Sequence, residues 1–206
     1  VNGGNAYDPY VSVSNGALFV DPLFKLVNKA GTGTVGSVDA SVETWWKNQF
    51  KSSSATTYAG FLKELRNFRN NCAKGPGGAP DLHIVDQNTY ELYESALAAA
   101  HRNPSYQVAD IPFDNVAFYR APVTWDQFMI DVQNYTTTIT KGTWLSLNSK
   151  FWYVKVHRGT NWMPTEFQKP VGQDAKTAHI LWLGGVGVSN RRKHGVMFNI
   201  DITIAS

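Results

Sequence analysis

Histidine, cysteine and serine most often carry catalysis or hold metals, and in this chain they lack the spacing that such sites need. Five histidines and one cysteine show neither the H-x-x-x-H nor the C-x-x-C pairing of metal sites. The sequence also lacks the G-x-S-x-G elbow of many hydrolases and the G-x-x-x-x-G-K-[ST] loop of nucleotide-binding enzymes. It therefore predicts no catalytic residue, no metal and no cofactor. The residues considered are His83, His101, His157, His179, His194 and Cys72.

Two further motifs could carry chemistry, and each has a simpler interpretation. Asp81 and Asp86 flank a predicted strand, but Asp86 is placed to cap the helix that follows, so an acid/base pair is not predicted. Residues 31–36 match the G-x-G-x-x-G pattern of dinucleotide sites. No strand precedes this match, no helix begins at its last glycine and no acidic residue follows about 20 positions later. A flexible turn is predicted there.

A basic run, Arg191-Arg192-Lys193, could contact phosphate groups. The net charge of the chain is only +3, which is too small to indicate nucleic-acid binding by itself. The run lies in a polar segment, residues 189–195, that ends in glycine and is typical of a turn. On charge grounds alone, a solvated turn is the preferred interpretation.

The amino-acid composition of the chain indicates a folded domain. The chain has 206 residues, of which 43% are hydrophobic and 13% aromatic, so it can bury a substantial core. One cysteine excludes an internal disulfide framework. No apolar run reaches the roughly 18 residues that span a bilayer, and the first residues do not resemble a signal peptide, so a soluble protein is expected. Because residue 1 is Val, the chain is expected to be a processed product or a part of something longer.

The elements that must position these residues follow from hydrophobic periodicity. Apolar residues at helical spacing predict an amphipathic helix over 58–72, with Cys72 as a buried filler at its end. A second helix is predicted after Asp86, ending before residue 103. A long loop is predicted over 158–172. The predicted strands before the C-terminal region are 82–85, 116–124 and 151–157.

The C-terminal region, residues 173–204, predicts two strands about which the fold is organised. Residues 175–188 are apolar on both sides and contain glycines that would allow a second backbone to approach, so this strand is expected in the core. Residues 196–204 alternate and predict a half-buried strand. Its inner face would hold Val196, Phe198, Ile200, Ile202 and Ile204, and its outer face Met197, Asn199, Asp201 and Thr203.

Several segments, in this order, resemble the C-terminal part of tailed-bacteriophage major capsid proteins with the HK97-like fold. They are T-G-T-V-G-S-V-D-A-S-V-E-T-W-W-K-N-Q at 32–49, P-D-L-H-I-V-D-Q-N-T-Y-E-L-Y-E-S-A-L at 80–97, F-D-N-V-A-F-Y-R-A-P-V-T-W-D at 113–126, and N-S-K-F-W-Y-V-K-V-H-R-G-T-N-W at 148–162 followed by residues 173–196. The resemblance covers about residues 17–200.

The resemblance implies an α+β fold with an axial domain, built on a central sheet flanked by helices, and part of a peripheral domain. Residues 37–145 would form the axial domain, and residues 146–206 the return strands of the peripheral domain. Residues 1–36 would be a lead-in segment that connects to the peripheral domain. The N-terminal arm, the E-loop and the spine helix of the family would precede the start of this chain.

The resemblance also implies a structural function. The chain would be a coat protein that self-assembles, as pentamers and hexamers, into an icosahedral shell enclosing a double-stranded DNA genome. Its other partners would be scaffold, portal or decoration proteins, and it would not bind a membrane. It would assemble in the host cytoplasm and would then be located in the virion. Some family members cross-link their subunits, but residues 161–166 and 173–174 do not reproduce that pattern. The chain is therefore not expected to be an enzyme.

The candidate residues are those that could contact neighbouring subunits or line a lumen. Aromatic and arginine side chains dominate such contacts, although each tryptophan could equally pack in a core. An alternative class is a carbohydrate-binding β-rich module, in which exposed tryptophans, Trp125 among them, would stack on sugars. The candidate contact residues are Trp45, Trp46, Arg158, Trp162, Lys169, Arg191 and Arg192.

Overall fold

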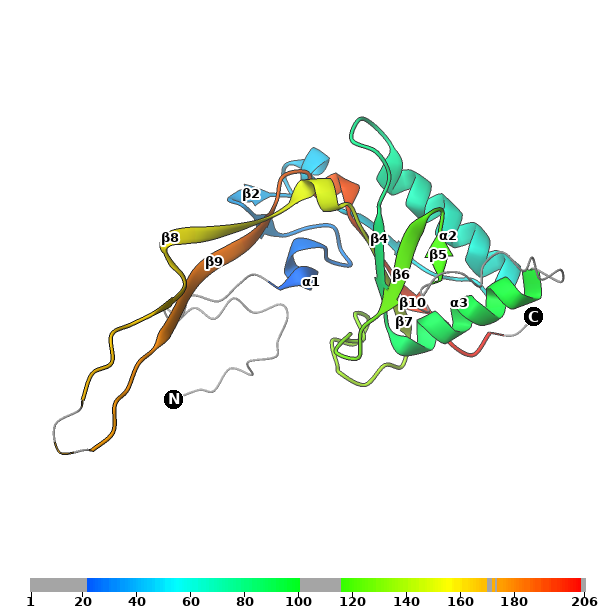
Figure 1. The fold of residues 1–206 in the computed structure, drawn as a ribbon. Coiled ribbons are helices and arrows are strands. Elements are labelled where there is room, and N and C mark those ends of the chain that lie inside the picture. The colour runs from blue at the N-terminus through cyan, green and yellow to red at the C-terminus, as the bar shows by residue number, and fades with distance from the viewer. Residues whose placement is uncertain (1–21, 101–115, 170–171, 173, 205–206) are drawn as a thin grey trace.

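The computed structural model describes residues 22–100, 116–169, 172 and 174–204, which form a mixed sheet with helices and a long two-stranded ribbon (Figure 1). The α+β class predicted from the sequence is confirmed. The helices are α1 (Leu23–Leu26), α2 (Tyr58–Ala73) and α3 (Gln87–Ala100), with short 3-10 turns η1 (Thr44–Trp46), η3 (Ser149–Phe151) and η4 (Arg191–Lys193). The strands are β1 (Thr34–Val35), β2 (Val38–Asp39), β3 (Gln49–Ser52), β4 (Leu82–Val85), β5 (Ala117–Phe118), β6 (Ala121–Trp125), β7 (Gly142–Leu147), β8 (Trp152–Pro164), β9 (Ile180–Val188) and β10 (Gly195–Ile200).

The main sheet has six strands in the order β3-β10-β7-β4-β6-β5. Two of its pairings are parallel, β10 with β3 and β4 with β6, and the other three are antiparallel. Strand β10 comes from the 146–206 segment, yet it lies between β3 and β7 near the middle of the sheet. The sheet is therefore complete only after the C-terminal part of the chain has added β10 to it.

Both long helices begin where a side chain satisfies free backbone N–H groups. Thr57 caps α2, because its hydroxyl oxygen accepts a hydrogen bond from the N–H of Gly60 at 3.2 Å. Asp86 caps α3, because its carboxylate accepts one from the N–H of Thr89 at 3.0 Å. The predicted helix over 58–72 and the predicted cap at Asp86 are confirmed. None of the helices in the described part of the chain is long and apolar enough to cross a membrane.

Each face of the sheet has its own hydrophobic core. The helices α2 and α3 pack on one face, around Trp144 and Met197. The N-terminal segment and residues near Ile130 cover the other face, around Leu145 and Val196. Neighbouring residues of β7 and of β10 therefore point into different cores, as the pleat of a strand requires.

This double covering corrects the prediction for the last strand. Met197 was expected on an outer face, but it is fully buried beneath α2 because helices cover that face. The strand also ends at Ile200 instead of continuing to residue 204. Asn199 has a φ of +57°, and the pairing of β10 with β7 shifts register between Met197 and Ile200. This bulge breaks the regular alternation on which the prediction depended.

Strand β9 also differs from its prediction. Residues 175–188 were expected in the core, but β9 pairs only with β8, and only its last residue, Val188, is buried. The two strands form a ribbon that projects away from the sheet (Figure 1). The loop predicted over 158–172 is wrong in its first part, because β8 continues to Pro164.

The strand predicted over 116–124 is a hairpin, β5 and β6. Tyr119 and Arg120 form its turn with φ values of +50° and +67°. Two consecutive residues with positive φ give the turn type that best matches the twist of paired strands. In this hairpin Ala121 lies opposite Phe118, and Pro122 lies opposite Ala117.

Candidate functional site

The candidate site is the corner segment, residues 189–194, which connects β9 of the ribbon to β10 of the sheet. It contains the basic run, folded as the 3-10 turn η4. Arg191 and Lys193 are buried, whereas Arg192 is exposed. The predicted turn is confirmed, but the prediction that the run is solvated holds only for its middle residue.

Arg191 is buried because backbone carbonyl groups of the N-terminal segment surround its guanidinium group. Its Nε donates to the carbonyl of Leu26 at 2.7 Å, and its Nη2 donates to that of Thr32 at 2.9 Å. Longer bonds reach Gly33 at 3.2 Å and Lys25 at 3.5 Å. Burial lowers the pKa of Arg191 to about 10, so the side chain stays charged at neutral pH. Of the two arginines in the basic run that were expected to contact DNA or neighbouring subunits, Arg192 faces solvent and Arg191 does not.

The same contacts explain the glycine-rich motif at 31–36. It forms the β1–β2 hairpin, closed by Gly36 and Ser37 with φ values of +61° and +65°. A phosphate-binding loop directs N–H groups at its ligand. Here the carbonyl groups of Thr32 and Gly33 point at Arg191 instead. The turn predicted for this motif is confirmed.

Lys193 attaches the corner to the end of α2. Its ammonium group donates to the carbonyl of Lys74 at 2.9 Å and to that of Gly75 at 3.0 Å, with longer bonds to Ala73 and Gly78. Carbonyl groups at a helix end carry partial negative charge, which favours a cation there. Burial and then the charge of Arg192 lower the pKa of Lys193.

Cys72 lies beside this contact and is fully buried. Burial raises the pKa of its thiol to about 12, against a smaller opposite effect of the charge on Lys193. A thiol with this pKa is not a nucleophile at neutral pH. Its position agrees with the predicted role of a small buried filler.

Two buried histidines accept hydrogen bonds from tryptophans, one in the corner and one in the sheet. The Nδ1 of His194 accepts from the indole N–H of Trp152 at 3.0 Å, which connects the base of the ribbon to the corner. The Nδ1 of His83 accepts from the indole N–H of Trp144 at 3.3 Å. Burial lowers the pKa of each imidazole to about 4. Among the described residues, no three His, Cys, Asp or Glu side chains lie together as a metal site would require.

These histidines predict that the fold loses stability as pH falls below about 6.5. A histidine with a native pKa of about 4 binds its proton more readily in the unfolded chain, so stability is complete above the unfolded pKa and declines as pH falls toward 4. Lowering pH from 8 to 5 should cost about 2 kcal/mol per histidine. Urea unfolding at the two pH values measures the loss.

A matched pair of variants assigns this loss to the buried imidazoles. His194→Gln should remove about half of the difference in unfolding free energy between pH 8 and pH 5, whereas His179→Gln, at an exposed position of the ribbon, should leave it unchanged. Depressed carboxylate pKa values, as at Asp131, act mainly below pH 4 and do not interfere in this range. Equal stability at the two pH values would contradict the prediction.

The other candidate residues fall into two groups. Trp46 is buried and donates its indole N–H to the carbonyl of Val35 at 3.1 Å, whereas its neighbour Trp45 is 59% exposed. Trp45 lies close to the corner and lines a pocket with Arg192. The second group lies on the ribbon and beyond it: Arg158, Trp162 and Lys169 are exposed, and Lys169 forms an ion pair with Asp174 at 2.6 Å.

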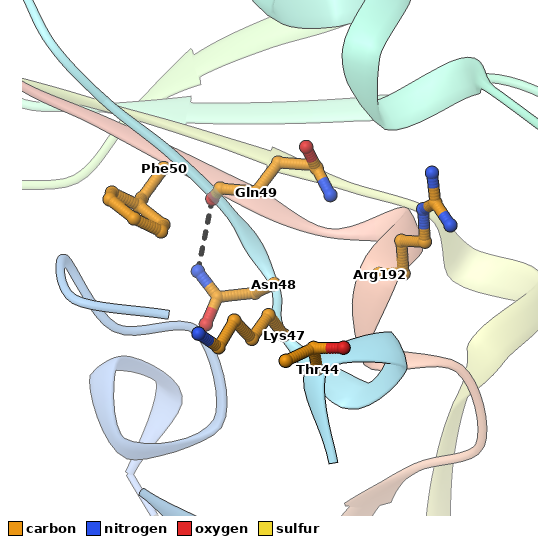
Figure 2. A pocket seen from close by; sticks show the side chains of 6 residues that line it. All are labelled: Thr44, Lys47, Asn48, Gln49, Phe50 and Arg192. Atoms are coloured by element: carbon orange, nitrogen blue, oxygen red, sulfur yellow. Dashed lines mark hydrogen bonds between the residues drawn. The ribbon is translucent and has the colours of Figure 1, made fainter. Parts of the chain in front are cut away.

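Two shallow pockets border the corner, and both are lined by Arg192. The first has a volume of about 330 Å³ and is lined by Lys47, Asn48 and Gln49 from the segment that enters β3 (Figure 2). The second has a volume of about 320 Å³ and is lined by Trp45 and Lys74, among others. Sequence reasoning missed both lysines, because only the fold brings residues near 47, 74 and 192 together.

The chemistry of these pockets is that of anion binding. Neither a carboxylate nor an imidazole is among the described residues that line them, whereas lysine and arginine side chains are. Such a set of groups attracts negative charge but offers no base to activate a nucleophile. No protein-family model and no curated protein matches the chain, so its own geometry is what indicates a function.

Proposed function

We propose that the chain corresponds to the C-terminal part of a tailed-phage coat protein with the HK97-like fold. It would assemble with copies of itself, as pentamers and hexamers, into an icosahedral shell around double-stranded DNA. The observation that carries the proposal is the β8–β9 ribbon, a long exposed element rich in apolar side chains. The collinear sequence resemblance and the helix-flanked sheet support it further.

The ribbon exposes several large apolar side chains. Val154 is 63% exposed and Trp162 is 69% exposed. A lone two-stranded sheet is marginally stable, and large contiguous apolar patches on soluble proteins mark interaction surfaces. Contact with other copies would cover this surface. The exposed apolar residues of the ribbon are Tyr153, Val154, Val156, Trp162, Met163, Ile180, Leu181 and Leu183.

Hydrogen bonds attach the base of the ribbon to the corner. Ser189 donates its N–H to the carbonyl of Phe151 at 2.9 Å, and Trp152 is hydrogen bonded to His194. The buried Arg191 and Lys193 hold the adjoining corner to the body. Closed shells require each subunit to present its contact surfaces at a constant angle, because the rotation per contact must close a ring.

Two glycines of β9 lack the Cβ atoms that would collide with nearby aromatic rings. A Cβ atom added at Gly187 would lie 2.6 Å from the ring of Tyr153, and one at Gly184 would lie 2.5 Å from the ring of Trp182. The sequence predicted that these glycines admit a neighbouring backbone. This holds at Gly184, where the added Cβ would also lie 2.8 Å from the backbone carbonyl oxygen of Lys155, whereas at Gly187 the Tyr153 side chain occupies the space. Both rings can therefore lie across the strand and offer flat surfaces to a partner.

In this proposal the main sheet and its helices form the axial domain, and the ribbon forms the peripheral part. The boundaries expected from the resemblance, 37–145 and 146–206, would then be crossed by β10, which returns to the sheet. Scaffold, portal or decoration proteins would be further partners, and the virion the location, after assembly in the host cytoplasm. The role is structural and not enzymatic.

A carbohydrate-binding module would need several tryptophans on one accessible platform. Trp46 is buried, and the exposed Trp45, Trp125 and Trp162 lie on three separate elements, η1, β6 and β8. This arrangement does not favour stacking of one sugar chain across them. Glycan-array binding that depends on Trp125 and Trp162 would support the module instead.

Under this proposal the chain is the C-terminal part of a longer coat protein, called the parent protein here. Electron microscopy of the parent protein expressed alone tests the proposal. Shell-like particles are expected from the unaltered protein. The double variant Val154→Ser and Leu181→Ser should prevent particles from forming, because it removes exposed apolar contacts of the ribbon. Phe128→Ser is the matched control, since Phe128 is 72% exposed on the body, away from the ribbon. A parent protein that stays monomeric, or a double variant that assembles normally, would overturn the proposal.

A further inference from the structure

Positively charged side chains gather at the corner. Five cationic side chains meet there: Lys47, Lys74, Arg191, Arg192 and Lys193. Within the part of the chain that the structure describes, none of the five forms an ion pair. Carbonyl dipoles hold the two buried cations but do not cancel their net charge, so a positive potential reaches the surface where Arg192 lies.

The two pockets share Arg192, and their combined lining is called the strip. Lys47 lines one of the pockets and Lys74 lines the other. Figure 2 shows Lys47 and Arg192 extending from separate stretches of chain. Cations distributed over two pockets in this way suit a chain of phosphate groups better than a single small anion.

Trp45 adds a fixed aromatic face to one end of the strip. Its indole N–H donates to the Glu43 carboxylate at 2.5 Å, and its ring packs edge-on against Trp46 with centroids 5.6 Å apart. Trp46 is itself held by the carbonyl of Val35. The exposed ring is therefore oriented before any ligand arrives, which lowers the entropy cost of stacking. Glu43 therefore places one carboxylate beside the Trp45 ring.

We infer that the corner binds single-stranded nucleic acid, with phosphates against Lys47, Lys74 and Arg192 and an unpaired base stacked on Trp45. A positively charged groove beside an exposed aromatic ring is the combination that single-strand-binding proteins use. A duplex would satisfy the cations but would present the face of a base only at its ends. The inference does not depend on the coat-protein proposal, since it concerns the corner and not the ribbon.

Fluorescence anisotropy of a short fluorescein-labelled oligothymidylate, titrated with the full chain, tests this inference. Trp45→Ala should weaken binding by about tenfold through loss of stacking. Three phosphate contacts should give a slope of about −2 for log K against log salt, and Arg192→Ala should reduce the magnitude of that slope by about 0.7. Lys63→Ala, which removes an exposed cation of α2 away from the corner, is the matched control and should change neither quantity.

Three results would overturn the inference. The first is the absence of oligothymidylate binding at low salt by folded protein. The second is an unchanged affinity in Trp45→Ala, or equal affinity for a duplex of the same length, because either shows that no base stacks. The third is equally effective competition by polyglutamate, which would make the corner a general site for acidic chains. Circular dichroism of each variant establishes that a loss of binding is not a loss of folding.

Discussion

Replacing Arg191 by methionine should lower the free energy of unfolding by about 4 kcal/mol, since it removes four hydrogen bonds from a buried charged donor, and such bonds contribute about 1.5–3 kcal/mol each when well formed. The methionine side chain fills much of the same space but donates no hydrogen bond. The carbonyl groups of Lys25, Leu26, Thr32 and Gly33 would lose their shared charged partner. Urea unfolding followed by circular dichroism measures the difference.

The neighbouring arginine provides the control. Arg192→Met makes the same chemical change one residue away, at an exposed position, and should alter stability by less than about 0.5 kcal/mol. Arg191→Lys should recover only part of the loss, because an ammonium group has three donors while the guanidinium group bonds to four carbonyls here. Equal effects of the two methionine variants would show that the carbonyl contacts of Arg191 contribute little.

Local signals in the sequence predicted the elements near them correctly. The helix over 58–72 was predicted from apolar spacing within the segment, and the structure adds a cap from Thr57, the residue just before it. The cap at Asp86 likewise depends on a residue three positions away. Such features can be predicted because the interactions that form them span only a few residues.

The burial of a strand cannot be predicted in the same way. Residues 180–188 have the composition of a core strand, but they form one side of an exposed ribbon because only β8 pairs with them. Met197 is the opposite case, because it follows a polar-face pattern and is nevertheless covered by helices. In both cases the outcome depends on which other elements pack there, and periodicity within one segment does not contain that information.

The corner was the least predictable part. The bond from Arg191 to Leu26 joins residues 165 positions apart, and the pockets combine residues near 47, 74 and 192. The sequence showed three consecutive cations, for which a solvated turn was the reasonable expectation. Because β10 returns to the sheet between β3 and β7, the corner lies against the N-terminal segment. This contact buries Arg191 and leaves Arg192 exposed.

The second large effect is expected at Asp86, which connects α3 to the centre of the sheet. Its buried carboxylate accepts from the N–H and hydroxyl of Thr89, at 3.0 and 2.7 Å, and from the N–H of Thr143 at 2.7 Å. Asp86→Ala should cost about 4 kcal/mol. Loss of a helix cap contributes up to about 2 kcal/mol, and a buried N–H left without an acceptor contributes about as much again.

Asp81→Ala is the matched control, because Asp81 is exposed and accepts hydrogen bonds only from Ser149 among the described residues. Its loss should cost about 1 kcal/mol, since water can replace the acceptor. Asp86→Asn should lie between the two alanine variants, because one amide oxygen can still cap α3 while the NH₂ group faces another donor. If Asp81→Ala and Asp86→Ala destabilised equally, burial would not be what makes the Asp86 contacts strong, and the link between α3 and β7 would be no stronger than a surface turn.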